Sequence, residues 1–148
     1  MRMEIRTPTN EEREEIMRLS PQSTFEGTMG RSKPSEAKMK LMVGELLAKG
    51  SRFLIASENQ EVRGWILFGK RTDEFSDQEI GFIYELFVLP EARGQSIASR
   101  LMERAVEQMR QESCSEIRLN AYVENRHAIR LYERLGFAAR NITMSLPL

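Results

Sequence analysis

A turn containing arginine and glycine joins an apolar run to a helix-like segment at residues 88–98. The apolar run stops at Pro90, Arg93 and Gly94 follow, and an amphipathic pattern begins directly after them. Main-chain N–H groups at a helix start are unpaired, and the helix dipole adds to their attraction for negative charge. The turn therefore predicts a phosphate- or pyrophosphate-binding loop. Glycine turns before helices are common in α/β proteins, so a purely structural turn stays open as the alternative.

A second pair of residues with chemical potential is Asn125 and Tyr132. Asn125 precedes a short amphipathic segment and suits a helix N-cap, and Gly136 follows its end, where left-handed backbone favours glycine. Tyr132 comes seven positions after Asn125, which places both side chains on the same helix face. A phenol there can donate a proton in catalysis. The alternative for Tyr132 is a core aromatic side chain on an apolar stripe.

The third candidate is Glu85, which interrupts the nearly apolar run of residues 79–89. Such a run predicts a central strand buried on both faces. A carboxylate removed from water there has a raised pKa, which suits a general base near neutral pH. Two alternatives stay open for Glu85, an ion pair with an arginine and exposure at the end of the sheet.

The elements that must position these residues alternate between strand and helix patterns. Thr9 and Glu12 fit a capping box that opens a first helix, and Ser20 with Pro21 predicts its end. A second helix is predicted to begin near Pro34 and a long one near Ile97. Strand patterns occupy residues 3–7, 52–57, 62–70, 79–89 and 116–122, a hairpin turn is predicted at 58–61, and one or two strands at 137–146. This order predicts an α/β (α+β) fold, with residues 1–148 in a single domain.

Composition excludes several classes of function. Lysine plus arginine (22) balances aspartate plus glutamate (22), which gives no general attraction to nucleic acid or membrane. The one cysteine, Cys114, cannot form an internal disulfide, and no cluster of Cys and His suggests a metal site. There is no apolar run long enough to cross a bilayer and no apolar signal-peptide centre. A cytoplasmic location without a metal or a nucleic-acid partner is therefore expected.

Two blocks of sequence resemble a known family. Residues 88–98, with Pro90, Arg93, Gly94 and Ala98, resemble the acetyl-CoA pyrophosphate loop of GNAT acetyltransferases, which follows the pattern [QR]-x-x-G-x-[GA]. Residues 125–137 resemble that family's N-x-x-A-x-x-x-Y-x-x-x-G-F block, and the two occur in the right order. The resemblance covers nearly the whole chain. It implies a GNAT fold with one mixed, mostly antiparallel central sheet of about six or seven strands, flanked by about four helices.

The resemblance also implies specific roles. The backbone of Leu86, Phe87 and Val88 would pair with the pantetheine arm of acetyl-CoA like an added strand. Asn125 would contact the CoA arm through its side chain, and Tyr132 would lie near the thioester sulfur as the acid that protonates the leaving thiolate. The amides that would hold the pyrophosphate are those of Arg93, Gly94, Gln95, Ser96, Ile97, Ala98 and Ser99.

Two positions depart from the family patterns. Position 96 is serine where the family usually has glycine, and its Cβ narrows the approach to the pyrophosphate and disfavours a positive φ. Its hydroxyl offers a compensating hydrogen bond. Some relatives use a glutamate on the strand after the central one as the base. The corresponding residue here is Asn120, which cannot act as a base, so Glu85 is the preferred candidate.

The predicted function is transfer of an acetyl group from acetyl-CoA, as cosubstrate, to a primary amine that attacks the thioester directly. The acceptor is not identified, and a small molecule is favoured over a protein. An acyl-CoA-binding module without turnover, regulatory or structural, is the alternative. A monomer or a homodimer is expected, since edge strands near residues 141–146 offer a pairing surface.

Overall fold

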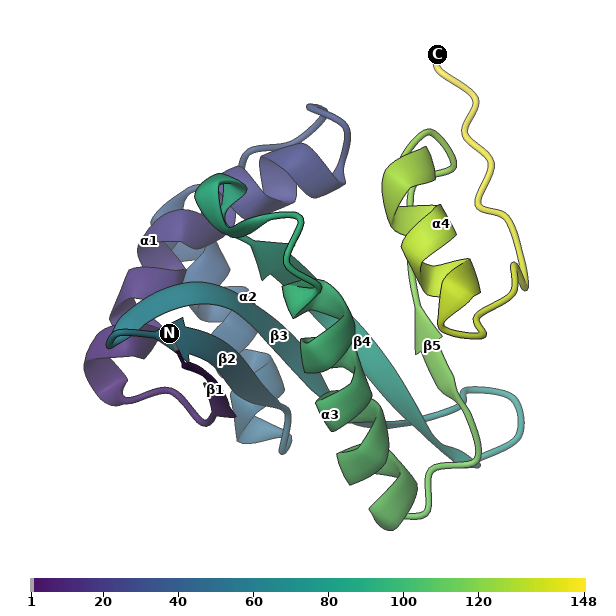
Figure 1. Cartoon of the computed structure of the whole chain (residues 1–148). Coiled ribbons are helices and arrows are strands. Elements are labelled where there is room, and N and C mark those ends of the chain that lie inside the picture. Colours follow the sequence, from purple (N-terminus) through teal and green to yellow (C-terminus); the bar gives the residue numbers. More distant parts are fainter. Residues whose placement is uncertain (1) are drawn as a thin grey trace.

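The computed structural model describes residues 2–148 and contains five strands and four α-helices within that range. In chain order they are β1 (Met3–Arg6), α1 (Asn10–Gly27), α2 (Glu36–Ala48), β2 (Arg52–Glu58), β3 (Glu61–Thr72), β4 (Glu79–Val88), a one-turn 3-10 helix (Pro90–Ala92), α3 (Ile97–Gln111), β5 (Ile117–Leu119) and α4 (Arg126–Arg134). Figure 1 shows their arrangement.

The sheet is mixed and mostly antiparallel, as predicted. Its strand order is β1-β2-β3-β4-β5, with antiparallel neighbours up to β4 and a parallel pair β4–β5 connected through α3. The strand count is lower than the predicted six or seven, because the structure has no strand at residues 137–146. β5 has three residues, so a sixth strand on its outer edge would gain few ladder hydrogen bonds.

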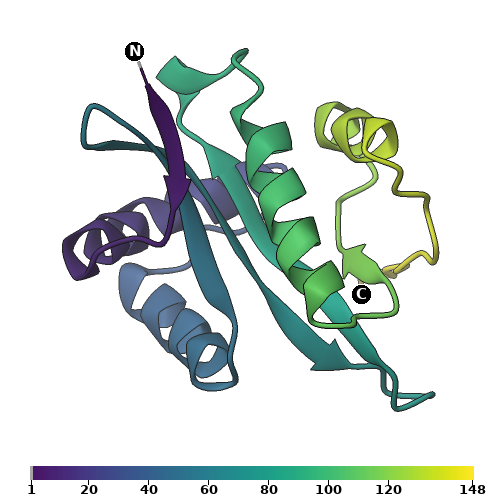
Figure 2. The same cartoon turned by 60° about the horizontal axis from the view of Figure 1, so that its bottom comes forward.

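Helices cover both faces of the sheet. α3 packs on one face, with Leu101, Met102 and Met109 almost fully buried, and Tyr132 of α4 packs against the same cluster. α1 and α2 cover the opposite face, where Trp65 and Ile16 are fully buried. Figure 2 shows α3 and the pair α1 and α2 on opposite sides of the strands. β4 is therefore covered on both faces, as its apolar sequence predicted.

The first helix begins as predicted but ends later. The Thr9 hydroxyl accepts from the Glu12 N–H at 3.1 Å, and the Glu12 carboxylate accepts from the Thr9 N–H at 2.9 Å, which forms the capping box. The predicted end at Ser20 and Pro21 is wrong, because α1 continues to Gly27 with Pro21 inside it. Proline removes one helical hydrogen bond, and burial of Ile16 and Met17 against the sheet face offsets that loss.

Glu12 also ties α1 to the first strand. Its two carboxylate oxygens accept from the Arg6 guanidinium at 2.7 and 2.9 Å, a bidentate pair in which the Glu12 side chain is only 13% exposed. These bonds lower the pKa of Glu12 from 4.5 to about 2.

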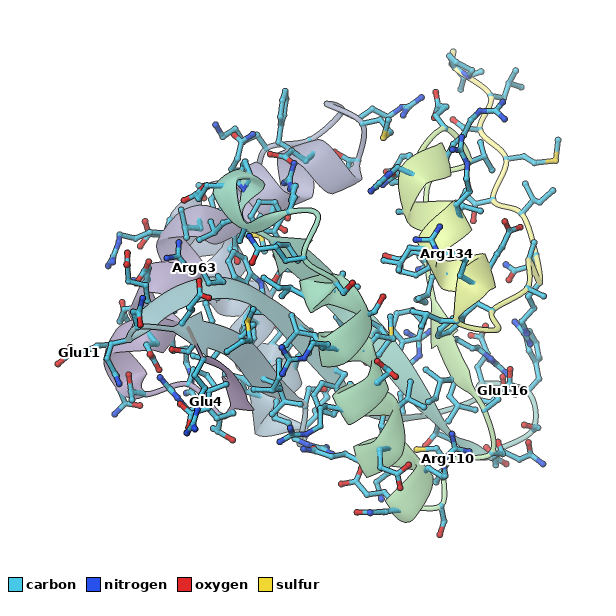
Figure 3. The ribbon with its side chains drawn as sticks, in the orientation of Figure 1. Glu4, Glu11, Arg63, Arg110, Glu116 and Arg134 are labelled. Carbon is cyan, nitrogen blue, oxygen red and sulfur yellow. The ribbon has the colours of Figure 1, made fainter. Side chains whose placement is uncertain are left out.

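Replacing Glu12 with glutamine is expected to destabilise the fold at pH 7 by about 1–3 kcal/mol, because the capping box and the ion pair are both weakened. The folded-state pKa is below the unfolded one, so this stabilisation is present above about pH 4.5 and is lost as the pH falls toward 2. Denaturant unfolding of the wild type and Glu12→Gln at pH 7 and pH 3 measures the difference in their free energies of unfolding. A Glu12→Gln difference that stays constant between these pH values would contradict the assignment. Glu11, which projects away from the sheet in Figure 3, provides the matched control substitution.

Candidate active site

A bulge in β4 determines where Glu85 points. Leu67 of β3 pairs with Glu85 and Phe68 pairs with Ile83, so Tyr84 is the extra residue in β4. The bulge interrupts the alternation of β4 side chains between the two faces of the sheet. Ile83 packs with the α3-face cluster, Tyr84 packs with the α1/α2-face cluster, and Glu85 also turns toward α1, where it meets Ser20 at 3.5 Å.

Beyond the bulge, β4 separates from β5. The parallel pairing joins residues 81–83 to Ile117–Leu119, so Ile83 is the last β4 residue with a β5 partner within the described part of the chain. Figure 1 shows β5 diverging from β4, with α4 standing across from the end of β4 and the start of α3.

The main-chain groups of β4 on this open edge can be identified from the ladder. Leu89 donates to the carbonyl of Arg63 in β3, so by alternation Leu86 and Val88 direct their N–H and C=O groups away from β3. Phe87 pairs with Trp65 and directs its own groups toward β3. Of the three residues predicted to pair with a pantetheine arm, Leu86 and Val88 therefore present backbone groups to the open edge, and Phe87 does not.

The loop between β4 and α3 is exposed from Arg93 to Ser96. Gly94 has φ +81°, and a side chain added there would meet no atom within 4 Å, so open space lies above the main chain at this point. Ser96 is the N-cap of α3, and its side chain makes no capping bond. Ala98 and Ser99 lie half-buried in the first turn of α3, whereas the Ile97 side chain is buried in the core and only its backbone faces the loop. The loop thus fits a bulky anion bound by amides at a helix start.

Ser96 adopts the left-handed conformation that its sequence position suggested. Its φ of +62° and ψ of +22° cost a residue with a Cβ roughly 1–2 kcal/mol. We expect Ser96→Gly to raise the free energy of unfolding by about 1 kcal/mol and to keep or improve CoA affinity. Ser96→Ala is the matched control, because it removes the hydroxyl but keeps the strain. Chemical denaturation and calorimetric CoA titration measure both effects, and a destabilised Ser96→Gly protein would refute the expectation.

The Arg93 side chain fixes this loop to two other elements. Its Nε donates to the Val88 carbonyl at 2.9 Å, and its terminal nitrogen donates to Glu26 at the end of α1 at 2.8 Å. The guanidinium also lies 5.4 Å from the Phe87 ring centroid. These contacts close the Val88 carbonyl to an added strand, so Leu86 and the Val88 N–H are the groups left on the open edge. Sequence analysis missed this anchor, because Glu26 is 67 residues away.

On the other side of the divergence, α4 positions Asn125 and Tyr132. Asn125 caps the helix as predicted, with its Oδ1 accepting from the Ala128 N–H at 3.3 Å. The Tyr132 ring packs edge-on against Phe137, with centroids 6.0 Å apart, and is half-buried. Burial raises the pKa of the Tyr132 phenol, so the hydroxyl keeps its proton at neutral pH. Tyr132 therefore packs in the core, the alternative that the sequence left open, and also carries a protonated hydroxyl.

Arg31 connects the α1 side of the site to the α4 side. Arg31, in the loop after α1, pairs with Glu124 at 2.8 Å and stacks on the Tyr122 ring at 5.3 Å. Glu124 directly precedes Asn125. The end of α1 and its following loop therefore contact both the Arg93 loop and the α4 N-terminus, which holds the two flanks of the site in place.

Glu85 lies in an environment that suits a base. Its Oε1 is buried and has no hydrogen-bond partner among the described residues, and the indole Nε1 of the fully buried Trp65 is in the same state. Burial raises the pKa of the Glu85 carboxyl, while the side chains of Trp65, Ser23 and Ser20 oppose part of that rise. Among the described residues no arginine pairs with this carboxylate, and its Oε2 accepts a hydrogen bond from the Ser20 hydroxyl at 3.5 Å.

Other polar residues fit structural roles. Asn120 follows the end of β5 and is exposed, and His127 is exposed on the first turn of α4. Burial raises the pKa of the Cys114 thiol, which disfavours a nucleophilic thiolate. Within residues 2–148, no group of His, Cys, Asp and Glu side chains is arranged to hold a metal ion. The helices of the same range include none that is long and apolar enough to span a bilayer.

Comparison with known proteins identifies the family. The model of the acetyltransferase (GNAT) family matches residues 14–137. The chain belongs to this family. An N-alpha-acetyltransferase, MAK3, of Arabidopsis thaliana is 46% identical over 57 residues, which are 38% of this chain and 30% of that protein. The matched region thus spans about a third of the length of this curated relative.

Solved structures of other proteins share the GNAT fold. A variant of the BH1408 protein of Bacillus halodurans superimposes with a TM-score of 0.82 at 21% identity, covering 98% of this chain and 99% of that one. An aminoglycoside N-acetyltransferase, AAC(6')-Iy, solved in complex with CoA, has a TM-score of 0.75 at 17% identity and covers 99% of this chain and 95% of its own. At these identities the similarity concerns the fold.

Proposed function

We propose that this GNAT protein transfers an acetyl group from acetyl-CoA to a primary amine, which attacks the thioester directly. The observation that carries the proposal is the divergence of β4 from β5 after Ile83, directly beside the exposed loop that starts α3. Main-chain donors at a helix start suit a pyrophosphate, and an open strand edge suits an amide-bearing arm. Acetyl-CoA supplies the activated acyl group when it is bound.

The residues of the chain have distinct tasks in this proposal. Amides of residues 93–99 bind the pyrophosphate, Leu86 and the Val88 N–H pair with the pantetheine arm, and the amide nitrogen of Asn125 extends that contact. An ammonium has no lone pair, so Glu85 accepts the proton that the amine must lose, directly or through water. The phenol of Tyr132 gives a proton to the leaving sulfur. The raised pKa of Glu85 favours its role as a base, and the raised pKa of Tyr132 keeps the phenol protonated at neutral pH.

The acceptor side is the α1/α2 face, because Glu85 turns toward α1. The first half of α1 carries four glutamates, Glu11, Glu12, Glu14 and Glu15, and part of their charge is neutralised. Glu12 pairs with Arg6, and Glu14 pairs with Lys40 at 3.5 Å. The name of the Arabidopsis relative supports an α-amino group as acceptor, and a small-molecule amine is the other class.

The alternative function is a module that binds acyl-CoA without turnover. Incubation with acetyl-CoA and a panel of amines, with thiol release followed by a colorimetric reagent and products identified by mass spectrometry, separates the two. Amine-dependent thiol release supports the acetyltransferase. Tight CoA binding without thiol release from any amine supports the binding module, and failure of CoA to raise the Tm would oppose both.

A further inference from the structure

A hollow opens on the α2 side of the sheet. It lies closer to the start of β4 than Glu85 does. Its volume is about 460 Å³, and it lies where the end of α2, the start of β2, the end of β3 and the start of β4 meet. The residues that define its character are Leu46, Lys49, Lys70, Arg71, Glu79 and Tyr84. The hollow is separate from the loop at residues 93–96, which contributes no residue to its lining.

The hollow has an excess of positive charge. Three basic residues, Lys49, Lys70 and Arg71, line it, and within the described residues Glu79 is its one acidic lining residue. Glu79 is paired with Lys70 at 3.5 Å. Lys49 and Arg71 have no carboxylate partner among the contacts of the described residues, so the hollow favours an anion.

Arg71 is held ready for such a ligand. Its guanidinium carbon lies 4.2 Å from the centroid of the Phe82 ring, and Phe82 in turn packs against Tyr84 with centroids 4.9 Å apart. Stacking on a buried ring fixes the plane of the guanidinium and leaves its N–H edge for a planar or tetrahedral anion.

The hollow is next to the proposed base. Tyr84, which forms part of its wall, is the bulged residue directly before Glu85, and both turn to the same face of the sheet. Because of the bulge, the spacing follows from β3, where Leu67 pairs with Glu85 and Gly69, roughly 7 Å further along, pairs with Phe82. Arg71 lies two β3 residues beyond Gly69 and stacks back on Phe82, so its guanidinium lies between roughly 7 and 13 Å from Glu85 along the sheet. A molecule that meets Glu85 with its amine can therefore reach Arg71 with a group about 10 Å away.

We propose that this hollow binds an anionic group of the acceptor, so that the preferred acceptor is a primary amine with a carboxylate or phosphate roughly 10 Å from its nitrogen. Lys49 attracts the anion and Arg71 receives it in a charge-assisted hydrogen bond. The inference rests on the proposed function, because it uses Glu85 as the point where the amine is held.

Linear ω-amino acids test both the charge and the spacing. Extended 8-aminooctanoate separates nitrogen and carboxylate by roughly 10 Å. We expect its kcat/KM to exceed that of 8-aminooctanamide about tenfold, the effect of one charge-assisted hydrogen bond, and Arg71→Met to abolish the difference. Arg52→Met is the matched control, because Arg52 stacks on Phe68 at 4.6 Å among the residues that face α3, and it should keep the preference. Equal rates for acid and amide in the wild type overturn the inference and leave acetyl transfer itself intact.

A binding measurement decides the matter if neither probe is acetylated. Calorimetric titration of the CoA-bound protein with 8-aminooctanoate should give an affinity about tenfold higher in the wild type than in Arg71→Met. The wild type should bind 4-aminobutanoate more weakly than 8-aminooctanoate, because the shorter chain does not reach from Glu85 to Arg71. Titration with 8-aminooctyl phosphate distinguishes phosphate from carboxylate, and preference for either over the neutral amide supports the inference. Indistinguishable titrations of the wild type and Arg71→Met overturn it.

Discussion

Replacing Tyr132 with phenylalanine is expected to lower kcat for acetyl transfer about 100-fold, within the range for loss of a general acid. The Kd for CoA and the Tm should change little, because the ring keeps its edge-on contact with Phe137 and its place against the α3-face core. The raised pKa of the buried phenol keeps it protonated at neutral pH, and phenylalanine removes only the hydroxyl group. Steady-state kinetics with calorimetric CoA binding measure the two effects.

The pH profile of the wild type provides an independent check. The phenol acts while protonated, so the activity of the wild type should fall as the pH rises through the raised pKa of Tyr132. Tyr132→Phe should lack this alkaline decline. Equal losses of turnover and CoA affinity in the variant would indicate a purely structural tyrosine. Tyr122→Phe, on an exposed ring, is the matched control.

Replacing Glu85 with glutamine is expected to lower kcat/KM about 100-fold at neutral pH, because the amide cannot accept the proton of the amine. In the wild type, kcat/KM should rise with pH through the raised pKa of Glu85, and the remaining activity of the variant should lack this dependence. Kinetics over a pH range in which the protein stays folded measure both effects. A variant with wild-type activity would exclude Glu85 as the base.

The same substitution should stabilise the protein. Burial raises the folded-state pKa of Glu85 above its unfolded value, so its contribution to stability is fully present below the unfolded pKa and is lost as the pH rises through the folded one. Above that point the protein holds a carboxylate whose Oε1 has no partner among the described residues. Glu85→Gln should therefore raise the Tm by a few degrees at neutral pH and not at acidic pH. Glu26→Gln, at an exposed ion pair, provides the control substitution.

Sequence patterns predicted the elements well where local chemistry determines them. The capping box of Thr9 and Glu12, the N-cap of Asn125 and the left-handed Gly136 are all present, because each depends on residues within a few positions. Pro21 was misleading for the opposite reason. Its local effect is to end a helix, and packing of α1 on the sheet prevails over that effect.

The arrangement of the candidate site residues was harder to predict from sequence than the elements that carry them. A strict alternation would place Glu85 on the same face as Ile83, and the bulge at Tyr84 turns it to the other. Only the ladder with β3 reveals that shift. The anchors of the site were also invisible, since Arg31 and Glu124 are 93 residues apart and no local pattern connects them.

The exposed loop before α3 offers mainly peptide groups to whatever it binds. Because every amino acid except proline has the same N–H, most substitutions from Gly94 to Ser96 would preserve the donors as long as the backbone keeps its path. The side chains of this turn can thus change without loss of the donors, within the limit that the positive φ values of Gly94 and Ser96 favour glycine there. The proposed acceptor face would instead work through side chains such as Glu85 and Arg71, so a single replacement there would change the chemistry that it offers.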